Sequence, residues 1–230
     1  VAPRVILNLT LVPGRTGFCR RRAIFVYKFS VMFCFLPAGE MIRTQEGLYM
    51  YPTLEQLKTI AQSGEYRRIP VCRELYSDRY TPVEVMRTLR TASRHCYLLE
   101  SASQTEVWGR YSFLGYEPSM EITCTDGKLQ IRKIHENGTE EKTVQQVKHP
   151  GDAIRQILKE YKSPVLEDMP TFTGGLVGYF SYDYIKYSEP KLNLTDETEQ
   201  DFRDMDLMLF DQVIAFDHYR QKVLLITGVM

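Results

Sequence analysis

Two adjacent polar residues, Glu100 and Ser101, stand at the end of an apolar run and could bind a charged ligand. They belong to residues 98–103, which read Leu-Leu-Glu-Ser-Ala-Ser. Adjacent strand residues point to opposite faces, so both side chains reach one ligand most easily where the strand ends. A carboxylate there would take an ammonium group in a charge-assisted hydrogen bond. The alternative is structural, with the Ser101 hydroxyl capping local backbone groups.

Arg110 and Ser112 form a second candidate pair, within residues 108–115, which read Trp-Gly-Arg-Tyr-Ser-Phe-Leu-Gly. A guanidinium presents a planar fork of donors that suits a carboxylate, so Arg110 could hold an acidic group with Ser112 beside it. The alternative is a hydrophobic strand that carries Arg110 on its solvent face, because arginine side chains are usually exposed.

Three glycines in residues 174–183, which read Gly-Gly-Leu-Val-Gly-Tyr-Phe-Ser-Tyr-Asp, give only a weak phosphate-loop signal. No Lys-Ser/Thr follows them, so we expect close backbone approach and a place in the core between two sheets. The sequence has no Ser-His-acid set and no cluster of metal ligands. Its five widely spaced cysteines indicate reduced thiols.

Helices and antiparallel strands must position these residues. Capping boxes predict helices that begin at Thr53 and Thr81, and a helical period predicts a third helix over residues 153–161. The turn Asp126-Gly127 predicts a hairpin, and the last expected strand should pair back onto the one before it. Because no βαβ rhythm is present, the class is α+β, with antiparallel β-sheets and flanking helices. The expected strands cover residues 96–99, 120–125, 128–134, 176–182, 207–216 and 222–226.

The composition is that of a globular protein, with 230 residues of which 43% are hydrophobic and 25% charged. It excludes a collagen-like, a disordered and a many-spanning membrane protein. Residues 1–40 carry six basic residues and one acidic residue, which leaves 23 basic and 28 acidic residues in the remainder. A mildly acidic body offers no electrostatic basis for nucleic acid, so we expect no nucleic-acid and no membrane partner.

Residues 1–40 differ from the rest of the chain. Three arginines at 20–22 precede the apolar run 23–37, a pattern typical of a signal peptide, and the lack of acids also suits an organellar transit segment. A third interpretation is that Met41 is the natural start, because amphipathic patterning begins only after it. We favour the third and predict that residues 1–40 are an unfolded extension of a domain over residues 41–230.

Three segments occur together in a specific order: LLESAS at 98–103, WGRYSFLGYEP at 108–118 and TGGLVGYFSYD at 173–183. This combination closely resembles the N-terminal domain of anthranilate synthase component I, a family of chorismate-utilising enzymes. The run over residues 204–218 resembles the same family further along. The resemblance covers residues 41–230 and none of residues 1–40.

The resemblance implies the N-terminal part of that family's fold and a place in tryptophan biosynthesis. Members of the family are lyases that convert chorismate to anthranilate and pyruvate. Their ammonia comes from a glutamine amidotransferase subunit, component II, and their chorismate site needs Mg²⁺. Their C-terminal chorismate-binding domain carries the catalytic and metal-binding residues, and this sequence reaches Met230 before those motifs. We therefore expect a cytoplasmic fragment with no catalytic residues, no cofactor and no metal of its own, which alone forms no anthranilate.

The resemblance also implies feedback inhibition by L-tryptophan, bound between the two domains of the complete enzyme. Glu100 would take the ammonium group of tryptophan, and Leu99 would pack on its indole ring. Binding would shift the population toward an inactive arrangement of the domains, which makes the inhibition allosteric. The tryptophan-binding residues implied in this sequence are Leu99, Glu100, Ser101, Arg110, Tyr111 and Ser112.

Two other functions stay open on the sequence alone. A fragment of aminodeoxychorismate synthase component I, which serves folate synthesis, would share much of the resemblance. A standalone amino-acid-binding module without catalysis would use the same polar residues. A truncated chain without function is a further alternative, in which apolar surface would promote association.

Overall fold

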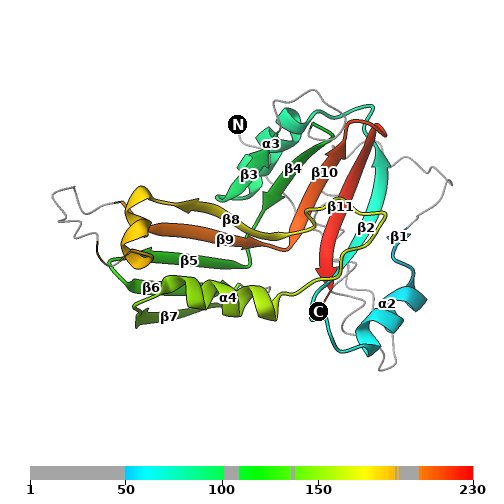
Figure 1. Ribbon diagram of the computed structural model, residues 1–230. Helices are drawn as coiled ribbons and strands as arrows, with labels where there is room; N and C mark the ends of the chain where they lie inside the picture. Colours follow the sequence, from blue (N-terminus) through cyan, green and yellow to red (C-terminus); the bar gives the residue numbers. More distant parts are fainter. Residues whose placement is uncertain (1–49, 101–108, 136–137, 190, 192–201, 230) are drawn as a thin grey trace. The chain divides into compact units, whose positions relative to one another are not determined.

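The computed structural model describes residues 50–100, 109–135, 138–189, 191 and 202–229. Within these residues the chain forms two antiparallel sheets with helices beside them (Figure 1). The predicted α+β class, with antiparallel sheets and flanking helices, is therefore confirmed. Residues 1–40 and Ser101 lie outside the described residues, so the expectations placed on them stay predictions.

One sheet joins strands that are distant in the sequence, and every neighbouring pair in it is antiparallel. The predicted pairing of the last strand with the one before it is confirmed, since Ile214 lies opposite Leu225. In spatial order this sheet consists of β1 (Met50–Tyr51), β2 (Ile69–Tyr76), β11 (Lys222–Val229), β10 (Gln212–Asp217), β4 (Tyr111–Tyr116) and β3 (Cys96–Leu99).

The other sheet contains the predicted hairpin around Asp126-Gly127, with Thr125 opposite Lys128. Both turn residues have positive φ, +48° and +73°, which is the conformation that the Asp-Gly pair favours in a two-residue hairpin. In spatial order this sheet consists of β7 (Glu140–Gln146), β6 (Lys128–Ile134), β5 (Met120–Thr125), β9 (Met205–Phe210) and β8 (Gly175–Phe180).

Two of the three predicted helices begin where their capping residues predict, and the third begins at Pro150, before the predicted residue 153. In α2 (Leu54–Gln62) and α3 (Pro82–Ala92), the hydroxyls of Thr53 and Thr81 each accept a backbone N–H at 3.3 Å, and each cap N–H is bonded in return. The third helix, α4 (Pro150–Glu160), begins with Pro150 in its first turn, where a missing N–H costs nothing. A short 3₁₀ helix, η1 (Tyr182–Tyr187), follows β8.

Each sheet has its own apolar cluster. Ile157 of α4 and Tyr184 and Tyr187 of η1 pack on the sheet that contains β5, around the buried Ile122 and Leu207. In Figure 1, α4 runs along that sheet. The cluster on the other sheet includes five buried strand residues: Cys72, Val213, Ala215, Leu224 and Ile226. Residues of the connection between α4 and β8 pack with them, namely Leu166, Met169 and Phe172.

The sequence predicts one strand over residues 207–216, and this prediction is wrong. The chain leaves one sheet after β9 and enters the other with β10, and Asp211 separates the two strands. The carbonyl of Asp211 accepts the N–H of Gly228 at 3.1 Å and a guanidinium N–H of Arg68 at 3.0 Å. These bonds to segments far away in the sequence hold the crossing, so a local pattern does not reveal it.

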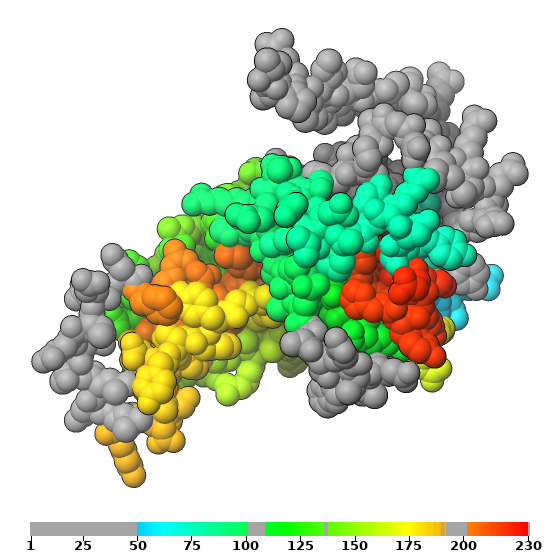
Figure 2. Space-filling model, turned by 90° about the horizontal axis from the view of Figure 1, so that it is seen from above, coloured from blue at the N-terminus to red at the C-terminus, as the bar shows by residue number. Residues whose placement is uncertain are grey.

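The glycine-rich strand β8 is an edge strand of its sheet within the described residues, and Tyr179 and Phe180 are 39% and 51% exposed. Its yellow and gold atoms, with those of η1, lie at the surface in Figure 2. The expected place in a core between sheets is therefore wrong. The expected close backbone approach is confirmed, because a Cβ on Gly178 would collide with the Asp206 carbonyl of β9.

Candidate functional site

Leu99 and Glu100 lie at an end of a strand, as the sequence predicts. β3 ends at Leu99, so Glu100 follows the strand. The side chain of Leu99 is 46% exposed, and Glu100 is exposed as well. Because the strand ends at Leu99, Glu100 is not bound to the alternation of the sheet, which is the condition expected for a side chain that shares a ligand with its neighbour.

Glu100 contacts Ser112, and both are predicted site residues. β3 pairs with β4 so that Leu99 lies opposite Phe113, and the same register brings Glu100 beside Ser112. The Ser112 hydroxyl is 3.3 Å from Glu100 Oε1 and donates to it. Ser112 itself is only 3% exposed, so its hydroxyl reaches the exposed carboxylate from inside the protein.

His218 completes this contact and was not among the predicted site residues. It follows β10, where Phe216 lies opposite Ser112, and its Nε2 is 2.7 Å from the Ser112 hydroxyl. The only sequence signal for His218 was its position at the end of the run over residues 204–218. Only the pairing of β10 with β4 shows that it belongs with Ser112 and Glu100.

The guanidinium of Arg110 binds a carboxylate of the protein itself, that of Asp217. Arg110 Nη2 is 2.7 Å from Asp217 Oδ2, and Arg110 Nε is 3.2 Å from both carboxylate oxygens. The Asp217 side chain is 2% exposed. Burial raises the pKa of this carboxyl, but the bonds from Arg110 and from the Arg220 N–H outweigh burial and lower it. The hydrogen bonds that Arg110 donates to Asp217 in turn raise the pKa of Arg110.

The structure divides the remaining predicted residues between two faces of the sheet. Residues directly opposite each other in an antiparallel pair share a face, so Leu99 lies on the face of Phe113 and Tyr111. The ring of Tyr111 packs 5.7 Å from that of Phe113, with the Arg110 guanidinium 4.8 Å from its centroid. Glu100 and Ser112 belong to the opposite face, so the structure brings these two together without Leu99 and Tyr111.

The polar contacts of this site suit ligand binding better than acyl transfer. Ser112 and His218 are as close as a catalytic nucleophile and its general base. In catalysis, however, the substrate must reach the nucleophile, and a third group must orient the base. Ser112 is buried, and Glu100 contacts the serine rather than the imidazole. An exposed carboxylate held by a hydroxyl is suited to bind a cation such as an ammonium group.

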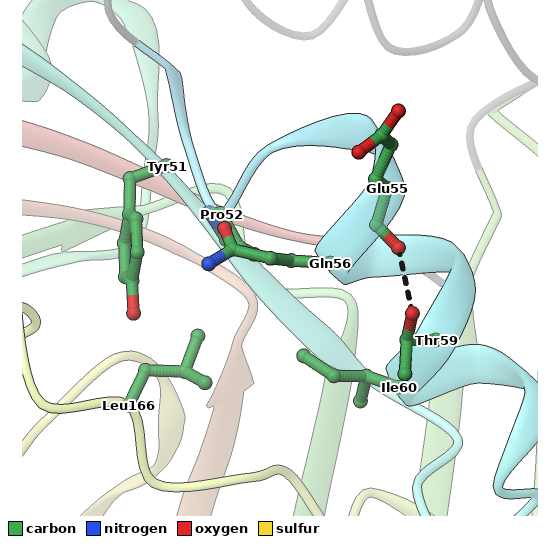
Figure 3. Close-up of a pocket in the computed structure, with 7 residues that line it drawn as sticks. All are labelled: Tyr51, Pro52, Glu55, Gln56, Thr59, Ile60 and Leu166. Carbon is green, nitrogen blue, oxygen red and sulfur yellow. Dashed lines mark hydrogen bonds between the residues drawn. The ribbon is translucent and has the colours of Figure 1, made fainter.

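A shallow groove of about 410 Å³ lies elsewhere, between α2, β1 and the chain around Leu166. Figure 3 shows Tyr51, Pro52 and Ile60 around it, while the Glu55 carboxylate points away from Leu166. The Thr59 hydroxyl donates to the Glu55 carbonyl at 3.0 Å, so it is used within the helix. The groove is mainly apolar and contains none of the predicted site residues.

In the part of the chain that the structure describes, no three side chains of His, Cys, Asp or Glu are grouped to hold a metal ion. The Mg²⁺ expected for the complete enzymes stays a prediction. The three cysteines among the described residues, Cys72, Cys96 and Cys124, are free thiols. The described helices include none with the length and apolar character needed to cross a bilayer.

Comparison with known proteins identifies relatives of this chain. A family described as chorismate binding enzyme matches residues 94–229. Anthranilate synthase component 1 of Acetivibrio thermocellus is 33% identical over 78% of this chain and 34% of that protein, and the Acinetobacter calcoaceticus protein of the same name is 37% identical over 75% and 34%. The crystal structure of anthranilate synthase component I from Streptococcus pneumoniae is 25% identical, with a TM-score of 0.39, over 65% of this chain and 30% of that chain.

These relatives confirm the resemblance to anthranilate synthase component I that the three motifs indicate. The chain spans about a third of the length of the curated relatives it matches. The family match covers more than half of the chain. The chain therefore belongs to the family of chorismate binding enzymes.

Proposed function

We propose that this chain is the tryptophan-sensing, N-terminal part of an anthranilate synthase component I. The observation that carries the proposal is the contact of Ser112 with Glu100, 3.3 Å long, at the end of β3. It holds an exposed carboxylate where the family resemblance implies the ammonium of tryptophan. The relatives named anthranilate synthase component 1 support the same assignment.

The arrangement favours recognition of a cationic group. Glu100 offers a carboxylate at the surface, whereas the Arg110 guanidinium is already bonded to Asp217. Arg110 would therefore support the site by holding the ends of β4 and β10 together. The exposed Leu99 would give the indole ring an apolar surface, with Tyr111 and Ser101 as further neighbours implied by the resemblance. Because Leu99 and Tyr111 lie on the other face of the sheet from Glu100, the ligand would have to extend around the end of β3 to contact both faces.

The complete enzyme would contain this chain as its N-terminal part. It would convert chorismate to anthranilate and pyruvate in the cytoplasm, with Mg²⁺ and a glutamine amidotransferase subunit as partner. Tryptophan bound at Glu100 would favour an inactive domain arrangement, with a coupling of about 1–3 kcal/mol as is typical of allosteric systems. This chain would contribute the regulatory part of the enzyme.

Binding of L-tryptophan to the chain tests the proposal, measured by calorimetry and by ligand-observed NMR. Glu100→Gln keeps the shape of the side chain but removes its charge, and we expect the dissociation constant to rise about ten-fold or more. Indole-3-propionate lacks the ammonium group, so Glu100→Gln should leave its binding unchanged. Glu141→Gln on the exposed strand β7 is the matched control. Absence of tryptophan binding to the unmodified chain would contradict the proposal.

Inhibition is tested in a chimeric enzyme of the full length of a relative. The chain replaces the matched part of the Acetivibrio thermocellus enzyme, and anthranilate formation is followed by its fluorescence. We expect Ser101→Phe to weaken tryptophan inhibition while chorismate turnover stays largely intact, because a bulky side chain would fill space meant for the ligand. If activity and thermal midpoint fell together with unaltered sensitivity, Ser101 would be a structural residue instead.

A further inference from the structure

Three side chains from three strand ends form a continuous hydrogen-bonded series. His218 Nε2 lies 2.7 Å from the hydroxyl of Ser112, and the same hydroxyl lies 3.3 Å from Glu100 Oε1. The three residues come from the ends of β10, β4 and β3, which are neighbours in one sheet. Sheet register, rather than sequence proximity, therefore brings them together.

The chemistry of the three groups fixes the direction of this series. An ionised carboxylate only accepts, and a serine hydroxyl has one proton to donate. When both contacts are made, Ser112 must donate its proton to Glu100, so its oxygen can only accept from the imidazole. His218 must then carry a proton on Nε2. Bonds that follow one another in this way polarise each other, so a donor at His218 strengthens the bond to Glu100.

The position of His218 is itself fixed by the backbone. Its N–H donates to the Arg110 carbonyl at 2.9 Å, and its carbonyl accepts from the Gln221 side chain at 2.8 Å. The preceding residue, Asp217, binds the Arg110 guanidinium. His218 is exposed in the β10–β11 turn, while the serine that it contacts is buried.

We propose that His218 is a positioning residue of the ligand site, which acts through Ser112 to hold the Glu100 carboxylate toward a ligand ammonium group. The inference rests on the proposed function, because it takes Glu100 as the ligand-binding group. Ser112 bonds to Oε1 of Glu100, and we assign the ammonium group to the other carboxylate oxygen. In the described part of the chain His218 is joined to Glu100 through the Ser112 hydroxyl, which gives His218 a supporting role.

The test measures L-tryptophan binding to the full chain with substitutions at His218 and Ser112. His218→Leu removes the donor and should raise the dissociation constant about three- to ten-fold, the loss expected for one hydrogen bond. His218→Gln supplies an N–H in place of Nε2–H and should stay within about two-fold of the original chain. Since His218 acts through Ser112, His218→Leu should have no further effect in a Ser112→Ala background.

Each alternative outcome has a distinct meaning. Three outcomes would overturn the role of His218. Tryptophan affinity could be unchanged in His218→Leu, or it could fall equally in the leucine and glutamine variants. The losses of affinity could also add in the double variant with Ser112→Ala. If the unmodified chain binds no tryptophan, the proposed function fails first. The series itself has a separate readout, the ¹⁵N spectrum of the His218 imidazole, which shows which ring nitrogen carries the proton. A proton on Nδ1 instead of Nε2 would overturn the proposed direction without any ligand.

Discussion

Arg110 and Asp217 are 107 positions apart in the sequence, yet they form an ion pair at the ends of β4 and β10, with Nη2 and Oδ2 2.7 Å apart. Asp217 also accepts the N–H groups of Tyr219 at 3.1 Å and Arg220 at 3.0 Å. One buried carboxylate thus holds the strand end and the β10–β11 turn that carries the candidate site. The negative charge of Asp217 should therefore contribute both to the stability of the fold and to the geometry of the candidate site.

We expect Asp217→Asn to lower the free energy of unfolding at neutral pH by roughly 1.5–3 kcal/mol, because the bonds that it removes involve charged groups. The pKa of Asp217 is held below its ordinary value of 3.8 in the folded protein. A lowered folded pKa gives stability that is complete above the unfolded pKa and is lost as the pH falls through the folded one. Urea unfolding should therefore show the difference between the two proteins shrinking below about pH 4.

Asp152→Asn is the matched control for Asp217→Asn. Asp152 pairs with Arg155 on the surface of α4, where both side chains are more than 70% exposed. Exposed pairs contribute little, so we expect a change of no more than about 0.5 kcal/mol. Equal stability of Asp217→Asn and the original chain at every pH would contradict the structural role given to Asp217.

Tyr187 ties η1 to the β5–β6 hairpin, and Tyr187→Phe should destabilise the protein. The Tyr187 hydroxyl donates to Asp204 Oδ2 and accepts the N–H of Gly127, both at 2.6 Å. Loss of the Tyr187 hydroxyl leaves the Gly127 N–H and the Asp204 carboxylate with fewer hydrogen-bond partners, which should lower the free energy of unfolding by roughly 1–3 kcal/mol. Hydrogen exchange of the Gly127 amide should become faster. Tyr182→Phe, at a tyrosine that is 85% exposed, should change neither quantity, and equal effects of the two substitutions would contradict the assignment.

Gly228→Ala should destabilise the protein because Arg68 occupies the space where a Cβ would lie. Arg68 is 4% exposed and donates to the carbonyls of Thr173 and Asp211, so it cannot swing into solvent without losing these bonds. Overpacking of this kind costs about 1–3 kcal/mol. Chemical denaturation provides the measurement. Gly151→Ala in α4, whose Cβ would meet its nearest atom at 3.4 Å, should be neutral or stabilising, and similar losses at both glycines would count against the packing argument.

Residues 1–40 should be dispensable for folding, because the capped and amphipathic pattern of the sequence begins only after Met41. A chain that starts at Met41 should unfold with the same thermal midpoint as the full chain. Calorimetry of the two chains under identical conditions gives the comparison. A clear drop of the midpoint in the shorter chain would show that residues 1–40 stabilise the rest.

Features encoded by neighbouring residues were predictable from the sequence. The caps at Thr53 and Thr81 depend on contacts between residues three positions apart, and the Asp126-Gly127 turn depends on two residues that tolerate positive φ. The strand over residues 96–99 has the predicted bounds, so the place of Glu100 just after it was also available from sequence. Local preferences of this kind act without any knowledge of the partner strand.

Other strands gave no usable local signal. β7 is exposed along its whole length and polar at nearly every position, so it has no apolar alternation, and only its ladder with β6 makes it a strand. β2 has four consecutive buried residues at its start, a pattern that does not separate a buried strand from a helix. The break at Asp211 depends on which sheet each half joins.

The sequence by itself determined the α+β class, the local caps and turns, the family, and the candidates Glu100, Arg110 and Ser112. Only the tertiary structure decided three contacts: the hydrogen bond between Ser112 and Glu100, the ion pair of Arg110 with Asp217, and the hydrogen bond between His218 and Ser112. The physical reason is that these contacts depend on strand register. Pairing of β3 and β10 on either side of β4 joins residues up to 107 positions apart, and such pairing is set by the packing of the whole sheet rather than by neighbouring residues.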